Sequence, residues 1–521
     1  MKECMHTQTV PLRRCPALLC SVQIFKDHNA AEASRVAYDN GQTAADGDAW
    51  KNTYIQLGLA HNSTSDKETV FLGNVQALGF MLGTQVQMRT VEFTNGPKAH
   101  PVLPMKQLAT EILRDYPKLL LFGHEYTDLV KVETELAQFW ARFRTTWHDH
   151  DDEHAGFGQG NKTLDSLLRH FVQDARDCYY DGLDSRNGKF YLVLIRLEGD
   201  LPAQAKLSHS GRNFTNDPNP MCPWCLADGR GLPFGDFRRN ALWRTTIATQ
   251  PPWNTSSPLH DLPGGEDDRF LAKDLFHISH LGIARTCVAS VICFLVAVGG
   301  HFHPTEGGVS VPACLKEAYK AFAFFCKNIL HETPDVKTFS REKMGWKSLA
   351  KMPETSWKGS DIRLLTKWLV DYLSRPWLFD DVTGHVYDFL TALDDFHRLC
   401  YVDSNRVWMN NAQMRTGRSL LARFFAGYSN AAQLCHAQGW LFFNITPKYH
   451  YLLHIEHDMA QSKGHSWGFN PACFTTQMDE DYMGVSSRMS RCAHPLGAAK
   501  RTAQRWLIYS WLQWKPWRFQ C

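Results

Sequence analysis

Two cysteines lie two residues apart in a proline-containing turn, in the segment NPMCPWCLADGRG (219–231). A C-x-x-C pair, here Cys222 and Cys225, lets two thiolates bind one metal ion from a single turn, and tetrahedral zinc takes such ligands. One pair supplies half of a four-ligand site. The other half must come from another part of the chain.

Candidates for the other half lie about fifty residues later, in KDLFHISHLG (273–282). On a helix, Asp274 and His277 share a face, and so do His277 and His280. We therefore predict a zinc site of Cys222, Cys225 and His277, with Asp274 or His280 as the fourth ligand. The alternative is a buried cysteine pair, a helix-capping aspartate and surface histidines.

Two other interpretations concern the same residue types. His450 and His454 are spaced i, i+4 on an expected helix, and we interpret them as packed or hydrogen-bonded histidines rather than metal ligands. A redox C-P-W-C would require a strand-to-helix context, whereas Gly, Asp and Pro follow the pair here. Zinc is therefore preferred to thiol redox chemistry.

Composition constrains the class of protein. The chain has 521 residues, 44% of them hydrophobic, with 17 Trp, which favours several structural units around a large core. Its net charge of +3 indicates no particular partner, so contacts with DNA must come from local patches. Fifteen cysteines without framework spacing favour a reducing, intracellular compartment. The longest apolar run (287–300) is too short to span a bilayer and predicts a buried core helix, with no membrane partner.

The order of expected elements suggests a fold. Apolar alternation predicts strands at 53–60, 69–80 and 84–93, and the run 189–200 is the best candidate for a central strand. Helical spacing dominates 105–147, 163–180 and 270–440, and two further helices are expected at 479–492 and 498–514. This order predicts an α/β fold. It would be a ribonuclease H-like mixed sheet, interrupted by a large all-α insertion and carrying a zinc-knuckle-like segment.

Five segments follow from this reading. They are a poorly defined N-terminal segment (1–50), the first part of the core (51–215), the Cys/His junction (216–285), the helical insertion (286–445), and the rest of the core with a basic, aromatic tail (446–521).

Acidic residues stand where metal chemistry would need them. Asp200 ends the expected central strand, and Glu480 lies among acids at an expected helix start. The alternative for Asp200 is a helix N-cap, and for the later acids a favourable interaction with the helix dipole. Together they suggest carboxylates that hold two Mg²⁺ ions about 4 Å apart, which activate water or a 3′-hydroxyl against a phosphodiester.

These residues, in their order, resemble a known family. The segments EGDLPAQAKL (198–207), CPWCLADGRG (222–231), KDLFHISHLG (273–282) and PKYHYLLHIEHDM (447–459) are similar to those of CACTA-like (En/Spm) and Kyakuja–Dileera–Zisupton transposases. The resemblance covers roughly 189–300 and 445–495. It implies a DDE-type transposase with a ribonuclease H-like fold that cuts and joins DNA with Mg²⁺. A structural Zn²⁺ at the cysteine turn and a nuclear location are expected with it. Self-association is left open.

The first acidic position departs from the family pattern. At the end of the first expected strand, in GLAHNSTSDKE (58–68), the chain has His61 and Asn62, and the nearest acid is Asp66. Asp48 is the other option. The predicted catalytic set is therefore Asp200, Glu480 and Asp66, with cleavage lost if neither Asp66 nor Asp48 reaches the metals. A catalytically inactive, zinc-stabilised DNA-binding or interaction protein on the same scaffold is the alternative.

Overall fold

The structure is a computed structural model. It describes residues 75–76, 81–93, 96–121, 123–124, 128–146, 162–185, 188–212, 220–228, 230–404, 407–461, 467–491 and 498–514. The expected strand at 53–60 and the residues Asp48, Asn62 and Asp66 lie outside these ranges.

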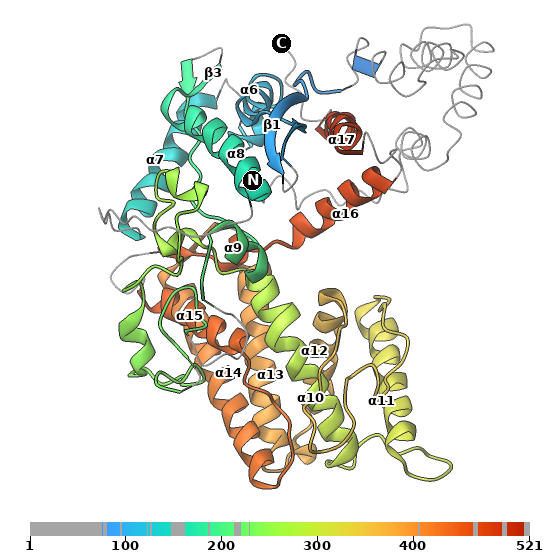
Figure 1. The fold of residues 1–521 in the computed structure, drawn as a ribbon. Helices are drawn as coiled ribbons and strands as arrows, with labels where there is room; N and C mark the ends of the chain where they lie inside the picture. Colours follow the sequence, from blue (N-terminus) through green and yellow to red (C-terminus); the bar gives the residue numbers. More distant parts are fainter. Residues whose placement is uncertain are drawn as a thin grey trace, which may run out of the picture.

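The first part of the described chain combines small sheets with helices (Figure 1). Strand β1 (Gln87–Phe93) pairs antiparallel with β2 (Gly96–Val102), and β3 (Leu183–Ser185) pairs with β4 (Gly188–Phe190). The helices here are α6 (Met105–Asp115), α7 (Leu129–Thr146) and α8 (Lys162–Tyr180). The strand expected at 84–93 and the helix expected at 163–180 are thus confirmed.

Helix α8 is held in place by a buried acid. Its Asp174 carboxylate accepts hydrogen bonds from the Met105 backbone N–H and from the Arg89 guanidinium, each at 2.9 Å. These bonds join α8 to β1 and to the start of α6. A charge-assisted contact of this kind is stronger than one between neutral groups and fixes the register of the three elements.

The larger part of the chain is a helical body with one continuous hydrophobic core (Figure 1). Its elements are α9 (Leu201–Leu207), the π-helical turn η6 (Phe276–Ile283), α10 (Ala284–Ala297), α11 (Val311–Phe325), α12 (Gly359–Leu373), α13 (Thr383–Arg398), α14 (Asn411–Ala437) and α15 (Pro447–Gln461). A short pair, β5 (Trp408–Asn410) and β6 (Trp467–Phe469), connects the start of α14 to the chain after α15.

Helix α10 lies at the centre of this body. The span Phe276–Ala297 is long and apolar enough to cross a membrane, but 83% of its most apolar window is buried inside the protein. Burial on all sides is what a core helix requires, as the sequence predicted for 287–300.

The chain returns to its first part through the last two helices, α16 (Gln477–Arg491) and α17 (Ala498–Trp514). Leu507 and Trp511 of α17 pack in one cluster with Leu82 and Tyr116, and Figure 1 shows α17 beside β1. Both final helices were expected from the sequence. The five-segment division of the chain stays a prediction.

The sheet expected from the sequence is only partly seen. In the part of the chain that the structure describes, the sheets have two strands each. The expected central strand at 189–200 is wrong beyond β4, because residues 191–196 form no ladder and Leu197 makes an isolated parallel bridge to Leu271. The run is half-buried rather than enclosed on both faces, with Tyr191 59% exposed. Since 53–60 is not described, the ribonuclease H-like core stays a prediction.

Candidate metal centre

Two cysteines and two histidines from distant parts of the chain meet in the helical body. The sulfur of Cys222 lies 3.2 Å from Nε2 of His454, and the sulfur of Cys225 lies 3.2 Å from Nε2 of His450. The two imidazole Nε2 atoms are 3.2 Å apart. All four ligand atoms lie within 4.8 Å of one another, and each side chain is at most 1% exposed.

This donor set fits a zinc ion. With zinc–sulfur bonds of ~2.3 Å and zinc–nitrogen bonds of ~2.0–2.1 Å, tetrahedral geometry places neighbouring ligand atoms about 3.3–3.8 Å apart. Four pairs of ligand atoms are 3.2–3.3 Å apart, at or just below the lower end of this range, and all pairs lie within 4.8 Å. Four protein ligands without solvent access form a closed site, which is typical of structural rather than catalytic zinc.

The elements around the site orient its histidines. His450 and His454 are one turn apart on α15 and therefore project from the same face. The Nδ1 atom of His450 is 3.0 Å from the Phe234 carbonyl oxygen, which fixes the ring with Nε2 toward the thiols. The Trp243 ring packs against both imidazoles, with centroids 4.6 and 4.9 Å away, and excludes water from them.

The cysteine turn has the geometry of a metal knuckle. Backbone N–H groups of Trp224 and Ala227 point at the sulfurs of Cys222 and Cys225 at 3.4 and 3.3 Å. Beneath the turn, the Arg212 guanidinium donates to the carbonyl oxygens of both cysteines at 2.9 Å. These donors position the sulfurs and favour the thiolate form that a metal requires.

Burial determines which protonation state the cysteine and histidine ligands favour before a metal binds. It raises the pKa of the Cys222 thiol well above its ordinary value and lowers the pKa of His454 well below its own. Neutral imidazole is the form that binds metal, so His454 is ready to do so. The thiols must release their protons when zinc binds, and zinc affinity should therefore rise with pH.

The structure groups the two cysteines with other histidines than the sequence interpretation expected. Cys222 and Cys225 meet histidines, but these are His450 and His454, which the sequence interpretation assigned to packing. Asp274 and His277 instead pair with each other.

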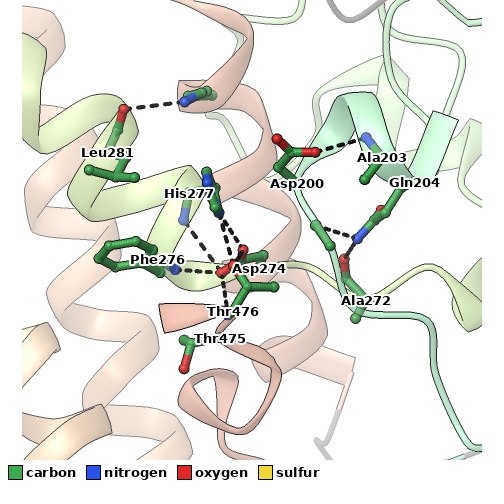
Figure 2. A network of polar contacts seen from close by, with 12 residues as sticks. Asp200, Ala203, Gln204, Ala272, Asp274, Phe276, His277, Leu281, Thr475 and Thr476 are labelled. Carbon is green, nitrogen blue, oxygen red and sulfur yellow. Dashed lines mark hydrogen bonds and ion pairs between the residues drawn. The ribbon is translucent and has the colours of Figure 1, made fainter. Parts of the chain in front are cut away.

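Both oxygens of the Asp274 carboxylate are hydrogen-bonded to neighbouring groups of the fold (Figure 2). One oxygen accepts from the Phe276 backbone N–H at 2.9 Å and the other lies 2.6 Å from Nδ1 of His277. The Thr476 hydroxyl also donates to this carboxylate. Asp274 therefore caps the turn that leads into α10 and connects it to the residue just before α16. It is 3% exposed and serves as a junction rather than as a ligand of the cysteine site.

His280 faces a different environment. Its ring stacks on His397, with centroids 4.0 Å apart and planes inclined by 18°. Its Nδ1 is buried and has no hydrogen-bond partner among the residues that the structure describes, and burial lowers its pKa to about 4. His280 is thus a neutral core histidine. The sequence proposed it as a fourth ligand because its spacing suits a helix face, yet that face turns toward α13.

The predicted catalytic acids are described only in part. Asp200 is the N-cap of α9, and its carboxylate accepts the Ala203 N–H at 2.8 Å. Glu480 lies in α16, but its side chain is not among those described, and Asp66 lies outside the described residues. The convergence of Asp200, Glu480 and Asp66 on two metals stays a prediction.

One signal could have identified the missed ligands. The sequence places two histidines at i, i+4 on an apolar helix, a spacing that brings both to one ion. Nothing in the local pattern connects them to cysteines 225 or more residues earlier.

No protein family, no curated protein and no solved structure matches this chain.

Proposed function

We propose that this protein is a DDE transposase-like DNA-binding protein in which a Zn²⁺ ion joins the helical body to the segment that follows Asp200. The observation that carries the proposal is the meeting of Cys222 and Cys225 with His450 and His454. The two pairs come from the two separate segments, 189–300 and 445–495, that resemble CACTA-like and Kyakuja–Dileera–Zisupton transposases. The meeting of residues from both segments supports the proposal, because the two segments that carry the resemblance lie next to each other in the fold.

The catalytic proposal is that Asp200, Glu480 and Asp66 hold Mg²⁺. Two contacts support it (Figure 2). Thr476, four residues before Glu480, bonds to Asp274. Gln204 of α9, the helix that Asp200 caps, donates to the Ala272 carbonyl oxygen at 2.7 Å, two residues before Asp274. These two contacts connect α9 and the residue before α16 to the same short segment, 272–274. Bound Mg²⁺ would neutralise phosphate charge and activate the attacking oxygen.

A second candidate function is DNA binding without cleavage, on the same scaffold. It is favoured by the use of the Asp200 carboxylate as a helix cap. It is also favoured by the neutral pair His61 and Asn62 at the expected first acidic position. Asparagine brings no negative charge to a divalent cation, so one of three shared ligands would be weak. We therefore expect little or no cleavage from the unmodified chain. A nuclear location belongs to both candidates.

The experiment is a nicking and strand-transfer assay with Mg²⁺ or Mn²⁺ on the full chain. The variants are Asp200→Ala, Asp200→Ser and Asn62→Asp. Serine keeps the helix cap but removes the carboxylate, so it separates loss of folding from loss of metal binding.

Each outcome assigns one function. Cleavage by the unmodified chain that disappears in Asp200→Ser would support the enzyme, with Asp66 or Asp48 as the first acid. Cleavage only in Asn62→Asp would mark a decayed site. DNA binding without cleavage in every variant would support the second candidate. A chain that neither binds nor cleaves DNA contradicts the proposal.

A further inference from the structure

A concave, arginine-rich surface lies beside the metal centre. Its volume is about 430 Å³, and it is formed by the loop that follows the cysteine turn and by α14. The charged residues that line it are Arg238, Arg239, Arg244, Arg415, Arg418 and Glu456. We call this surface the arginine pocket.

The pocket carries an excess of positive charge. Glu456 accepts from Arg244 at 3.0 Å through one oxygen and from Arg418 at 2.8 Å through the other. Arg238 is paired with Asp236. For Arg239 and Arg415, no carboxylate lies within ion-pair distance among the residues described. Five guanidiniums against two carboxylates thus leave three positive charges uncompensated.

Part of the pocket is rigid before any ligand arrives. The side chain of Arg244 is 12% exposed, and its guanidinium lies over the Trp243 ring, 4.6 Å from its centroid. The Glu456 carboxylate that joins Arg244 to Arg418 is 8% exposed. Groups held in this way lose little conformational freedom on binding. Arg239 and Arg415 are exposed and can close on a ligand from two sides.

The other residues that line the pocket leave room for a polymer backbone. On α14, the small residues Ser419 and Ala422 follow Arg418 in the lining, and Phe237 lines the pocket from the loop. Guanidinium groups bind phosphate oxygens in a planar, bidentate manner, and an aromatic face accepts a sugar or base. The volume exceeds that of a single phosphate and suits a nucleotide-sized segment.

We propose that the arginine pocket binds the phosphodiester backbone of DNA, with Arg239 and Arg415 as its ligand-facing charges. This inference deepens the proposed function and rests on its DNA-binding part. The metal centre would set the geometry of the pocket. Trp243 packs on both metal-site histidines, and Glu456 lies two residues after His454 on α15.

The test measures DNA affinity of the full chain against salt concentration, by fluorescence anisotropy with a labelled duplex. The test variant is Arg239→Ala with Arg415→Ala. The control is Arg363→Ala with Arg423→Ala, which removes the same charge from two ion-paired arginines outside the pocket. Each lost phosphate contact lowers the log–log salt slope by about 0.9, so the test variant should lose about 1.8. Between roughly 50 and 200 mM salt, wild-type affinity should then fall about twelvefold more than that of the variant.

A conservative variant separates charge from geometry. Arg239→Lys with Arg415→Lys keeps the positive charges but not the bidentate fork, so it should keep the salt slope and bind more weakly. A test variant with the wild-type salt slope would overturn the inference while leaving DNA binding intact.

Calorimetry with inorganic tripolyphosphate and with polyglutamate tests the pocket apart from DNA. We expect tripolyphosphate binding that the test variant loses and the control keeps. If the chain binds tripolyphosphate in this way but not DNA, the proposed function fails and the phosphate chemistry of the pocket stands. Equal or tighter binding of polyglutamate would overturn the choice of a nucleic acid, because it would identify an acidic protein segment as the partner.

Discussion

The stacked pair of His280 and His397 makes a quantitative prediction about acid stability. The folded-state pKa of His280 is about 4, chiefly because its ring is buried, whereas an exposed histidine has a pKa of about 6.5. Between these two values the unfolded chain binds a proton that the folded chain does not. The free energy of unfolding should therefore fall as the pH falls through this window.

The size of the effect follows from the two values. From about pH 7 to about pH 5, the differential protonation of His280 alone removes about 1.8 kcal/mol of stability. The charged groups that act on it are Arg363, which lowers the pKa further, and Asp274, which raises it. The pKa of His397 is also lowered by burial, so it adds to the fall in the same direction.

The assay is urea unfolding of the full chain at several pH values, with His280→Phe as the test variant. Phenylalanine keeps an aromatic ring against His397 and removes the titrating group. The variant should lose about 1.8 kcal/mol less than wild type over this pH range. Equal losses for wild type and His280→Phe would refute the assignment of His280 as a neutral core residue.

Two further predictions concern the junctions around the metal centre. Arg212→Ala leaves the Cys222 and Cys225 carbonyls without the guanidinium donor, so it should destabilise the protein by about 2–4 kcal/mol in urea unfolding. Arg212→Lys should restore only part of this stability. An effect below the error of the measurement would show that the guanidinium does not support the turn. Asp274→Asn should keep bound zinc, measured by elemental analysis, yet speed hydrogen exchange in the first turn of α16, since it weakens the contact with Thr476; loss of zinc would restore Asp274 as a ligand.

Local patterns in the sequence predicted local structure well. Helix α8 and strand β1 follow from their periodicity, and α10 from an apolar run on all sides. The cap at Asp200 also follows, because an aspartate before Leu-Pro has the chemistry of a helix start. These features depend on neighbours within a few residues.

Features that depend on distant partners were not predictable in this way. The run 189–200 has the composition of a central strand, but beyond the short β4 only Leu197, among the described residues, forms a bridge, to Leu271. The metal ligands show the same limit, since the turn with Cys222 and the helix with His450 meet only after the helical body has packed. Spacing along the sequence favoured His277 as a ligand, because it is nearer to the cysteines in the chain. Tertiary packing instead places the more distant His450 and His454 beside them.

The central claim is that one zinc ion joins the cysteine turn to α15. Zinc-edge X-ray absorption of the purified full chain tests it directly. We predict two sulfur neighbours at ~2.3 Å and two nitrogen neighbours at ~2.0–2.1 Å. This signal should persist in His277→Ala and disappear when His450 and His454 are both replaced by alanine. A chain that binds no zinc, or a two-sulfur, two-nitrogen signal that survives the loss of both histidines, would contradict the account.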